Sequence, residues 1–227
     1  MIRKNRPIPG HTAKLLIFDL DGTLIDSRRD LADSANDALI AFGAPPLAEE
    51  AIGRMVGDGA PILIARAFLA SGVVQPAGAL GSFLAAYDRR LLNHTRPYPG
   101  IVEVLDELES RASLGVLTNK PLDATRKILE GLDLARHFSP SRVIGGDGPF
   151  PRKPDPSGLL HLMRNDGVER DATVLVGDSL TDWKTAQSAA VPICLARYGF
   201  GWQGAPSDLP SANAWVVDRP AELLQYL

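Results

Sequence analysis

Cysteine is nearly absent from this sequence: Cys194 is the only one among 227 residues. A lone cysteine excludes an internal disulfide, and its position inside the apolar run 191–195 favours a buried, inert thiol over a nucleophile. Proteins without disulfides suit a reducing compartment, so we expect this one in the cytoplasm.

An excess of either charge is also missing. The 24 basic and 27 acidic side chains leave a net charge of −3, and no block of like charge stands out. The chain lacks the basic surface that nucleic acids or anionic membranes attract, so we expect neither as a partner. With 45% hydrophobic residues it can bury a substantial core. That core is enough for one medium domain with a subdomain, or for two small domains.

Long apolar runs of the kind that enter membranes are missing as well. Residues 1–12 carry three basic side chains, but they continue into prolines and glycine rather than an apolar stretch. They therefore lack a signal-peptide core, and we expect a flexible tail. Residues 67–87 are free of charge, yet Gln75, Pro76 and three glycines interrupt them. We expect two amphipathic helices joined by a loop there, and no transmembrane helix.

Short apolar runs typical of buried strands are what the sequence does contain. Between most of them lie helical patterns, such as the apolar spacing of Ile101, Leu105 and Leu108. This alternation predicts an α/β fold with a doubly wound parallel sheet. The expected strands are residues 14–18, 114–118, 142–145, 173–177, 191–196 and 215–217.

One long segment breaks the alternation. Residues 28–92 contain no convincing strand and at least three helical patterns, and they follow the first strand directly. Open α/β sheets bind ligands outside the carboxyl ends of their strands, and this insertion emerges from that edge. We therefore expect it to lie over a ligand site as a lid.

Two carboxylates stand at the end of the first strand. Asp19 and Asp21 follow the apolar run 15–18, and residues i and i+2 of a strand point to one side, so the pair is expected to face the same space. Gly22 lets the backbone turn away. Anions this close repel each other unless a cation is bound, so the pair predicts half of a metal and phosphate site. Such a segment alone is also typical of an Asp-rich turn or a calcium loop.

Three further side chains are expected at the same edge. Thr118 ends the second strand, where a hydroxyl and backbone N–H groups can hold phosphate oxygens, although a lone threonine there usually caps a helix. Lys153 lies between two prolines that fix its path, and it could aim its ammonium group at phosphate and at Asp19. Asp178 follows the strand 173–177 and supplies a third carboxylate, a set that suits Mg²⁺.

Four segments, taken in order, resemble the motifs of the haloacid dehalogenase (HAD) superfamily, most of whose members are phosphatases. They are residues 18–27, which contain the DxDGTL signature, and residues 117–120, 152–156 and 176–182. Segments similar to the phosphoglycolate phosphatases of that superfamily are residues 55–60, 96–100, 118–121 and 145–147. Residues 111–114 depart from these relatives, which tend to have a glycine before the second strand. The departure touches a turn and not the chemistry.

The resemblance implies a HAD-like Rossmannoid core and a helical cap. The core would consist of residues 13–26 and 93–227, and the cap, of the first type known in this superfamily, of residues 27–92. The hinges would lie near residues 26–27 and 93–97.

The resemblance also implies a magnesium-dependent phosphomonoesterase that works through an aspartyl-phosphate intermediate. Asp19 would be the nucleophile and Asp21 the acid and base. Thr118 and Lys153 would complete the catalytic set. Asp182, one turn into a helix, would act at the metal site, pair with Lys153, or only place a favourable charge near the start of the helix. The implied metal-binding residues are Asp19, Asp21 through its backbone carbonyl, Asp178 and Asp182.

Substrate recognition is expected to reside in the cap, because the core motifs contact only phosphate and metal. The first candidate substrate is 2-phosphoglycolate, a small phosphorylated metabolite whose carboxylate needs a cation or N–H donors. Arg54 and the backbone at Gly57 are the cap candidates, and Thr118, Asn119 and Lys153 are the candidates for holding phosphate. Arg54 is equally well explained as a solvated arginine in a turn between helices.

Other functions stay open from the sequence. The substrate could be N-acetylmuramic acid 6-phosphate, a nucleotide or pyrophosphate, and a phosphomutase would share the nucleophile. A non-catalytic binding protein would keep the fold, although such proteins usually lose a reacting group. A dehalogenase is disfavoured by the acid at position 21, and a phosphonate hydrolase by the lack of any lysine in residues 27–92 for a Schiff base. Both a monomer and a homodimer fit the sequence.

Overall fold

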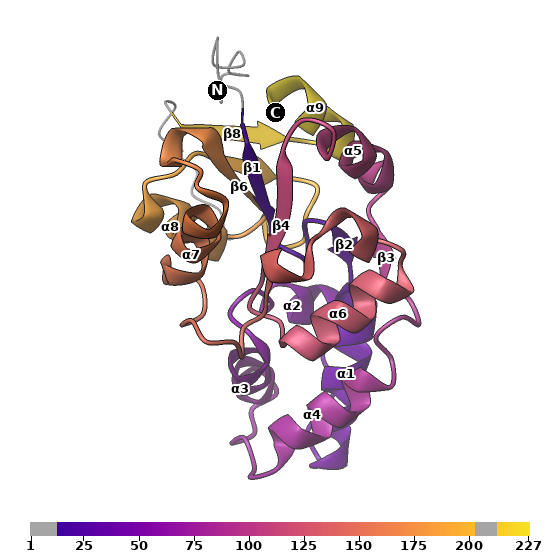
Figure 1. The fold of residues 1–227 in the computed structure, drawn as a ribbon. Helices are drawn as coiled ribbons and strands as arrows, with labels where there is room; N and C mark the ends of the chain where they lie inside the picture. The colour runs from indigo at the N-terminus through magenta and orange to yellow at the C-terminus, as the bar shows by residue number, and fades with distance from the viewer. Residues whose placement is uncertain (1–12, 203–212) are drawn as a thin grey trace, which may run out of the picture.

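A six-stranded parallel sheet forms the centre of the protein (Figure 1). The computed structural model describes residues 13–202 and 213–227, so the expected tail at 1–12 lies outside the described residues. The strands are ordered β5-β4-β1-β6-β7-β8. Their bounds are β1 Leu15–Phe18, β4 Ser113–Leu117, β5 Val143–Ile144, β6 Thr173–Gly177, β7 Ile193–Ala196 and β8 Ala214–Val217. This order confirms the predicted doubly wound α/β fold.

The two faces of the sheet are covered by different helices. Alternate residues of β1 enter two separate apolar clusters, Leu15 and Ile17 in one, Leu16 and Phe18 in the other. The first cluster includes α7 (Ser157–Asp166) and α8 (Leu180–Ala189). The second includes α5 (Ile101–Leu108), α6 (Leu122–Gly131) and α9 (Leu223–Tyr226). Burial on both faces explains why β1 is an unbroken apolar run.

Four helices lie between two short strands that pair with each other. β2 (Ile25–Asp26) and β3 (Arg96–Pro97) form an antiparallel ribbon that the sequence did not predict. We call the segment between them the helical insertion. Its helices are α1 Arg28–Ala41, α2 Glu49–Gly53, α3 Ala60–Ala70 and α4 Ala79–Asp88.

The charge-free stretch 67–87 falls on the end of α3, a loop and most of α4, which confirms the expected pair of helices. No helix among the described residues is long and apolar enough to cross a membrane.

A buried carboxylate ties the helical insertion to its return strand. Asp30 in α1 is fully buried and accepts hydrogen bonds from the backbone N–H groups of His94 and Thr95 and from the Thr95 hydroxyl, at 2.7–3.1 Å. A buried charge satisfied by three donors fixes the two chain segments against each other. The insertion is therefore anchored just before β3.

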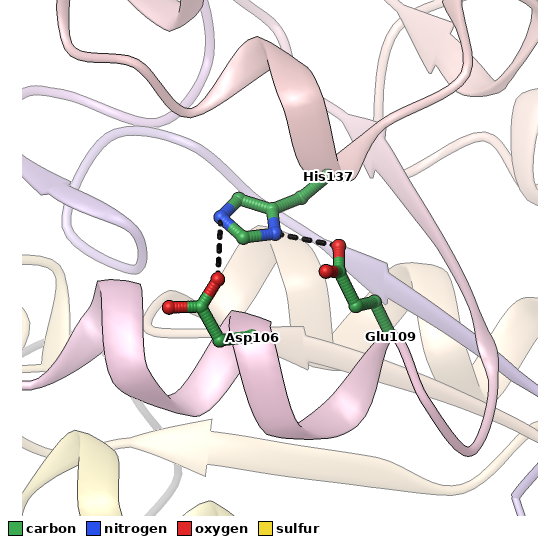
Figure 2. Close-up of side chains that lie close together, drawn as sticks. All are labelled: Asp106, Glu109 and His137. Atoms are coloured by element: carbon green, nitrogen blue, oxygen red, sulfur yellow. Dashed lines mark hydrogen bonds and ion pairs between the residues drawn. The ribbon is translucent and has the colours of Figure 1, made fainter.

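A second polar cluster joins the end of α5 to the 3₁₀ turn η1 (Ala135–His137), which follows α6 in the chain (Figure 2). Nδ1 of the buried His137 lies 2.7 Å from Oε2 of Glu109, and Nε2 lies 3.9 Å from Oδ1 of Asp106. Arg136 donates to the same Asp106 oxygen at 2.7 Å. Further 3₁₀ turns among the described residues include η2 Pro140–Arg142, η3 Arg170–Ala172 and η5 Pro220–Glu222.

Candidate active site

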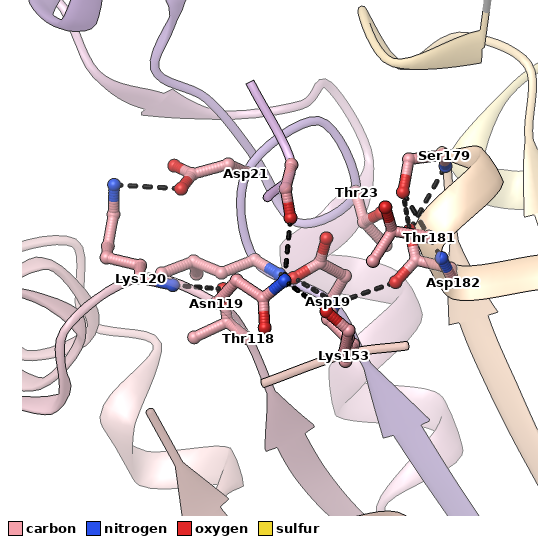
Figure 3. Close-up of polar contacts among 12 residues, drawn as sticks. Asp19, Asp21, Thr23, Thr118, Asn119, Lys120, Lys153, Ser179, Thr181 and Asp182 are labelled. Atoms are coloured by element: carbon pink, nitrogen blue, oxygen red, sulfur yellow. Dashed lines mark hydrogen bonds and ion pairs between the residues drawn. The ribbon is translucent and has the colours of Figure 1, made fainter. Parts of the chain in front are cut away.

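Three adjacent strands end at one polar site. β4, β1 and β6 lie side by side in the sheet, and the residues that follow them include Thr118, Asp19 and Asp178. Parallel strands bring their carboxyl ends to one edge, so residues far apart in sequence meet there. Lys153, in the loop before α7, reaches the same place (Figure 3). All four residues are at most 5% exposed.

Lys153 is held between two carboxylates. Its Nζ lies 2.9 Å from Oδ1 of Asp19 and 2.6 Å from Oδ1 of Asp182. Burial alone would favour the neutral amine, but Asp182 and Asp19 outweigh it and raise the pKa of Lys153 above its ordinary range. The ammonium group is therefore a fixed positive charge beside Asp19.

Asp182 has both carboxylate oxygens in hydrogen bonds. Oδ2 accepts from the backbone N–H and the hydroxyl of Ser179, at 3.1 and 2.6 Å, while Oδ1 accepts from Lys153. Ser179 and Asp182 form a capping box at the start of α8. The residue thus fixes the end of β6 to α8 and orients the ammonium group of Lys153.

Asp19 is a buried carboxylate with an unusual proton affinity. Burial raises its pKa from an ordinary 3.8 to about 6, against the opposing attraction of Lys153, and Asp182 adds to the rise. Its Oδ1 also accepts from the backbone N–H of Leu20 at 2.7 Å. A cation bound beside Asp19 would stabilise the ionised form of this carboxylate.

Asp178 completes a group of three buried carboxylates. Ligand oxygens of Asp19, Asp178 and Asp182 all lie within 4.8 Å of one another. Burial, and then the charges of Asp182 and Asp19, raise the pKa of Asp178 well above its ordinary value. Its Oδ2 accepts from the backbone N–H of Gly201 at 2.7 Å. Lys153 offsets only part of the repulsion among these carboxylates, and hard oxygen ligands of this kind suit a divalent cation.

Because Gly22 has no side chain, the Asp178 carboxylate can approach its backbone closely. Its φ is +85°, and a Cβ built on it would lie 2.0 Å from Oδ2 of Asp178. Any other residue would displace the carboxylate and strain the turn. The DxDG sequence therefore requires its glycine for the approach of β6 as well as for the turn.

Asp21 faces the same cavity as Asp19 but belongs to a different ion pair. β1 ends at Phe18, and Asp21 lies in the turn that follows, so the i, i+2 rule for strands does not set its direction. Its Oδ2 lies 2.8 Å from Nζ of Lys120, and Ser27 donates to Oδ1 at 2.5 Å. The side chain thus points away from the three-carboxylate group.

Lys120 is a site residue whose role the sequence did not reveal. Its buried ammonium group also donates to the hydroxyl of Tyr87, in α4, at 2.7 Å. Burial opposes its charge, but Asp21 and then Tyr87 raise the pKa of Lys120 above its ordinary range. One cation therefore connects the turn after β1, the loop after β4 and the helical insertion. The motif at 117–120 was the only sequence signal for it.

Thr118 and Asn119 use their side chains differently. Thr118 lines the cavity, and its hydroxyl accepts from the backbone N–H of Lys120 at 3.3 Å. The Asn119 amide donates to the carbonyl oxygens of Gly57 and Lys153, at 2.8 and 2.9 Å, while its buried Oδ1 has no hydrogen-bond partner among the described residues. Asn119 therefore links the insertion to the Lys153 loop.

Comparison with known proteins agrees with this geometry. The family model described as haloacid dehalogenase-like hydrolase matches residues 16–196. The chain belongs to the haloacid dehalogenase-like hydrolase family. A phosphoglycolate phosphatase of Rhodospirillum rubrum is 44% identical over 196 residues, which are 82% of this chain and 80% of that protein. Phosphoglycolate phosphatase 1 of Pseudomonas aeruginosa is 36% identical over 219 residues, 93% and 78% of the two chains.

A solved structure shows the same fold. The crystal structure of a predicted phosphoglycolate phosphatase from Haemophilus somnus superimposes with a TM-score of 0.83 at 29% identity, covering 94% of this chain and 97% of that one. The helical insertion of this hydrolase is thus part of an arrangement found in a relative.

The helical insertion closes a cavity of about 440 Å³ over the site. Asp19, Asp21 and Thr118 contribute to its lining from the core, and Gly57 contributes from the insertion. Arg54, the expected cap cation, is exposed and is not among the lining residues. Arg152, on the core side, lines the cavity instead, and its Nε donates to the carbonyl of Gly146 at 2.8 Å.

Proposed function

We propose that this protein is a magnesium-dependent phosphomonoesterase that acts through an aspartyl-phosphate and hydrolyses 2-phosphoglycolate to glycolate and phosphate. The observation that carries the proposal is the buried ion pair of Asp19 and Lys153, with Asp19 lining the cavity beneath the helical insertion. A carboxylate beside a fixed ammonium group is placed to receive a phosphoryl group. The relatives named phosphoglycolate phosphatase support the choice of substrate.

The first step transfers the phosphoryl group to the protein. A carboxylate oxygen of Asp19 forms a bond to phosphorus while the bond from phosphorus to the ester oxygen breaks. Lys153 and the hydroxyl and N–H groups at Thr118 bind the phosphoryl oxygens, whose charge they offset. Asp21, in its protonated form, gives its proton to the departing ester oxygen.

The second step returns the protein to its starting state. Asp21, now a carboxylate, takes a proton from a water molecule, which attacks phosphorus. The bond between phosphorus and Asp19 breaks, and inorganic phosphate leaves. Lys120 and Ser27, bonded to Asp21 on either side, hold it in place for both proton transfers.

Magnesium fits a site whose buried carboxylates have raised pKa values, as those of Asp19 and Asp178 have. The residues that would hold it are Asp19 and Asp178, with the backbone carbonyl of Asp21. When bound, Mg²⁺ would offset negative charge on the phosphoryl group and on the carboxylates. We assign Asp182 to the orientation of Lys153, because its oxygens already accept three hydrogen bonds.

The remaining assignments concern the setting of the reaction. The core would comprise residues 13–26 and 93–227, with residues 27–92 as the cap. A buried, unpaired Cys194 supports a reducing cytoplasm. We propose that the protein works there as a monomer or homodimer on a small phosphorylated metabolite.

The test measures phosphate release from 2-phosphoglycolate with and without Mg²⁺. We expect magnesium-dependent release by the wild type. With p-nitrophenyl phosphate, the Asp21→Asn variant should accumulate a phosphorylated protein, detected by mass spectrometry, because hydrolysis of the intermediate lacks its base. Absence of release from 2-phosphoglycolate in a panel where another phosphate ester is hydrolysed would reject the substrate but not the chemistry.

A further inference from the structure

The cavity over the site is larger than 2-phosphoglycolate requires. Its volume of about 440 Å³ lies in the range of about 300–1,000 Å³ that encloses drug-sized ligands. Asp19 and Thr118, which we assign to the phosphoryl group, are two of its lining residues. A two-carbon acid bound there by its phosphate would leave most of the volume to solvent.

The volume does not result from a detached insertion, because the insertion is bonded to the core around the site. The Asn119 amide donates to the Gly57 carbonyl at 2.8 Å, and the Thr181 hydroxyl donates to Asp58 at 2.7 Å. On the other side, Lys120 donates to Tyr87 at 2.7 Å. Three contacts, two from the loop after β4 and one from α8, hold α4 and the loop before α3 in place. The space is therefore a property of the closed arrangement.

The wall that the insertion contributes is apolar. From α3 and α4 it receives Leu63, Leu80, Phe83 and Leu84. Phe83 stacks on Tyr87 with ring centroids 5.7 Å apart and planes 6° from parallel, so the wall is fixed. An apolar ligand body in contact with this wall would bury apolar surface, which would favour binding.

The charged groups around the cavity disfavour an anionic ligand body at the wall. Asp88, Asp123 and Asp147 are among the lining residues, and Lys127, which is not among them, bonds to Asp88 and Asp123 at 2.7 and 2.9 Å. Of the two lining cations, Lys120 is already bonded to Asp21 and Tyr87. The other, Arg152, lies beside Gly59, where a Cβ would be 3.3 Å from its Nε, and could serve a carboxylate close to the phosphate. The wall of α3 and α4 is left without a cation of its own.

We propose that the wall of α3 and α4 is a second substrate subsite, which binds the uncharged apolar body of a larger phosphate monoester. The proposal rests on the phosphomonoesterase activity proposed above and extends its substrates to esters of bulky apolar alcohols or phenols. Phosphate and metal groups act on both classes alike. The apolar wall contacts only the larger class.

The experiment compares 1-naphthyl phosphate with 2-phosphoglycolate in three proteins: wild type, Leu84→Asp and Leu69→Asp. Leu84 lines the cavity from α4 and is 39% exposed, while Leu69 is 80% exposed on α3 and is absent from the lining. Both variants place a carboxylate on an exposed helical position, so they are matched in fold risk. Comparing each substrate between proteins removes the different reactivity of the two leaving groups.

We expect the wild type to hydrolyse both esters. Leu84→Asp should lower kcat/KM for 1-naphthyl phosphate about tenfold, because an apolar contact is replaced by a charge, and change the value for 2-phosphoglycolate less than about twofold. Leu69→Asp should change neither value more than about twofold.

Each other result is decisive. Hydrolysis of 2-phosphoglycolate without hydrolysis of 1-naphthyl phosphate overturns the subsite and leaves the proposed function standing. An equal loss for both esters in Leu84→Asp, or no loss for either, also overturns the subsite. Hydrolysis of 1-naphthyl phosphate alone, with the expected loss, supports the subsite and rejects 2-phosphoglycolate. If neither ester is hydrolysed, both proposals fail.

Discussion

Two clusters of acidic and histidine side chains in the described residues are equally compact but differ in burial. In each, ligand atoms of three residues lie within 4.8 Å of one another. Asp19 and Asp178 follow β1 and β6, Asp182 lies in the first turn of α8, and all three are buried. Asp106 in α5 and Glu109 just after it are exposed, and only their partner His137 is buried. Acidic side chains therefore lie close together both in a candidate catalytic site and in a surface contact.

The direction of the pKa shifts separates the two clusters. Burial raises the pKa of Asp19 to about 6, although Lys153 opposes the rise. On the surface, the hydrogen bond from Arg136 lowers the pKa of Asp106. The first cluster holds charge that the fold leaves incompletely compensated, and the second is already neutralised by its own arginine. Uncompensated buried charge is what indicates a site for a cation or a phosphate.

The largest expected effect is the loss of turnover in Asp19→Asn. An amide cannot attack phosphorus, so kcat should fall by at least about 10³-fold. The matched change in the surface cluster, Glu109→Gln, should leave kcat within about twofold. Phosphate release from 2-phosphoglycolate measures both. Residual activity of more than a few per cent in Asp19→Asn would show that the nucleophile lies elsewhere.

Lys120→Met should lower kcat by roughly 10–100-fold, because Asp21 loses the cation that orients it. Tyr87→Phe keeps the ring and removes only the hydroxyl, so its effect should be smaller and in the same direction. Phosphate release from 2-phosphoglycolate measures kcat of both variants, and a Lys120→Met kcat equal to that of the wild type would show that Lys120 does not orient Asp21.

Asp178→Asn should raise the Mg²⁺ concentration for half-maximal rate by about tenfold or more, because one of few anionic ligands becomes neutral. Glu109→Gln should leave the titration unchanged. A magnesium titration of each variant with 2-phosphoglycolate makes the comparison. Equal titrations for wild type and Asp178→Asn would remove Asp178 from the metal site.

The strands and the residues at their ends could be predicted because their signals are local. β1 and β6 are largely apolar runs, and an aspartate directly follows each. This order of residues along the chain places Asp19 and Asp178 at the same edge of a parallel sheet. The direction of Asp21 could not be predicted, since the strand stops at Phe18 and the turn sets it. A rule for strand residues fails in the turn beyond the strand.

The parts that could not be predicted depend on contacts between distant elements. Lys120 meets Asp21 and Tyr87 only after β1, β4 and α4 have been assembled, and nothing beside it in sequence announces those partners. Arg54 was chosen for its nearness to Gly57 in the chain, but the turn after α2 leaves it exposed. Short-range sequence spacing therefore locates strand ends better than it locates cavity walls.

Metal-free protein should become more stable when Asp19 is replaced by asparagine. The pKa of Asp19 is about 6 in the folded protein and 3.8 ordinarily, so the folded state binds the proton more tightly. Wild-type stability is then lost as the pH rises from about 4 to about 6, and Asp19→Asn avoids that loss, on the order of 1–3 kcal/mol at pH 7.

Urea unfolding in EDTA at pH 4, 5, 6 and 7 measures this difference. The gap between Asp19→Asn and wild type should open between about pH 4 and pH 6 and stay constant above. Excess Mg²⁺ should narrow it by stabilising the wild type. A gap that is independent of pH would show that burial does not penalise the Asp19 charge.

The smallest effect is expected for Glu109→Gln on stability. The glutamine carbonyl can still accept from Nδ1 of His137, and Arg136 still bonds to Asp106, so only one half-exposed charge is lost. Exposed ion pairs contribute little, and the melting temperature should fall by no more than about 2–4 °C. Thermal unfolding with and without Mg²⁺ checks this, and the magnesium-induced rise in melting temperature should equal that of the wild type. A smaller rise in Glu109→Gln would mean that the surface cluster binds the cation too, and the contrast drawn from burial would then be wrong.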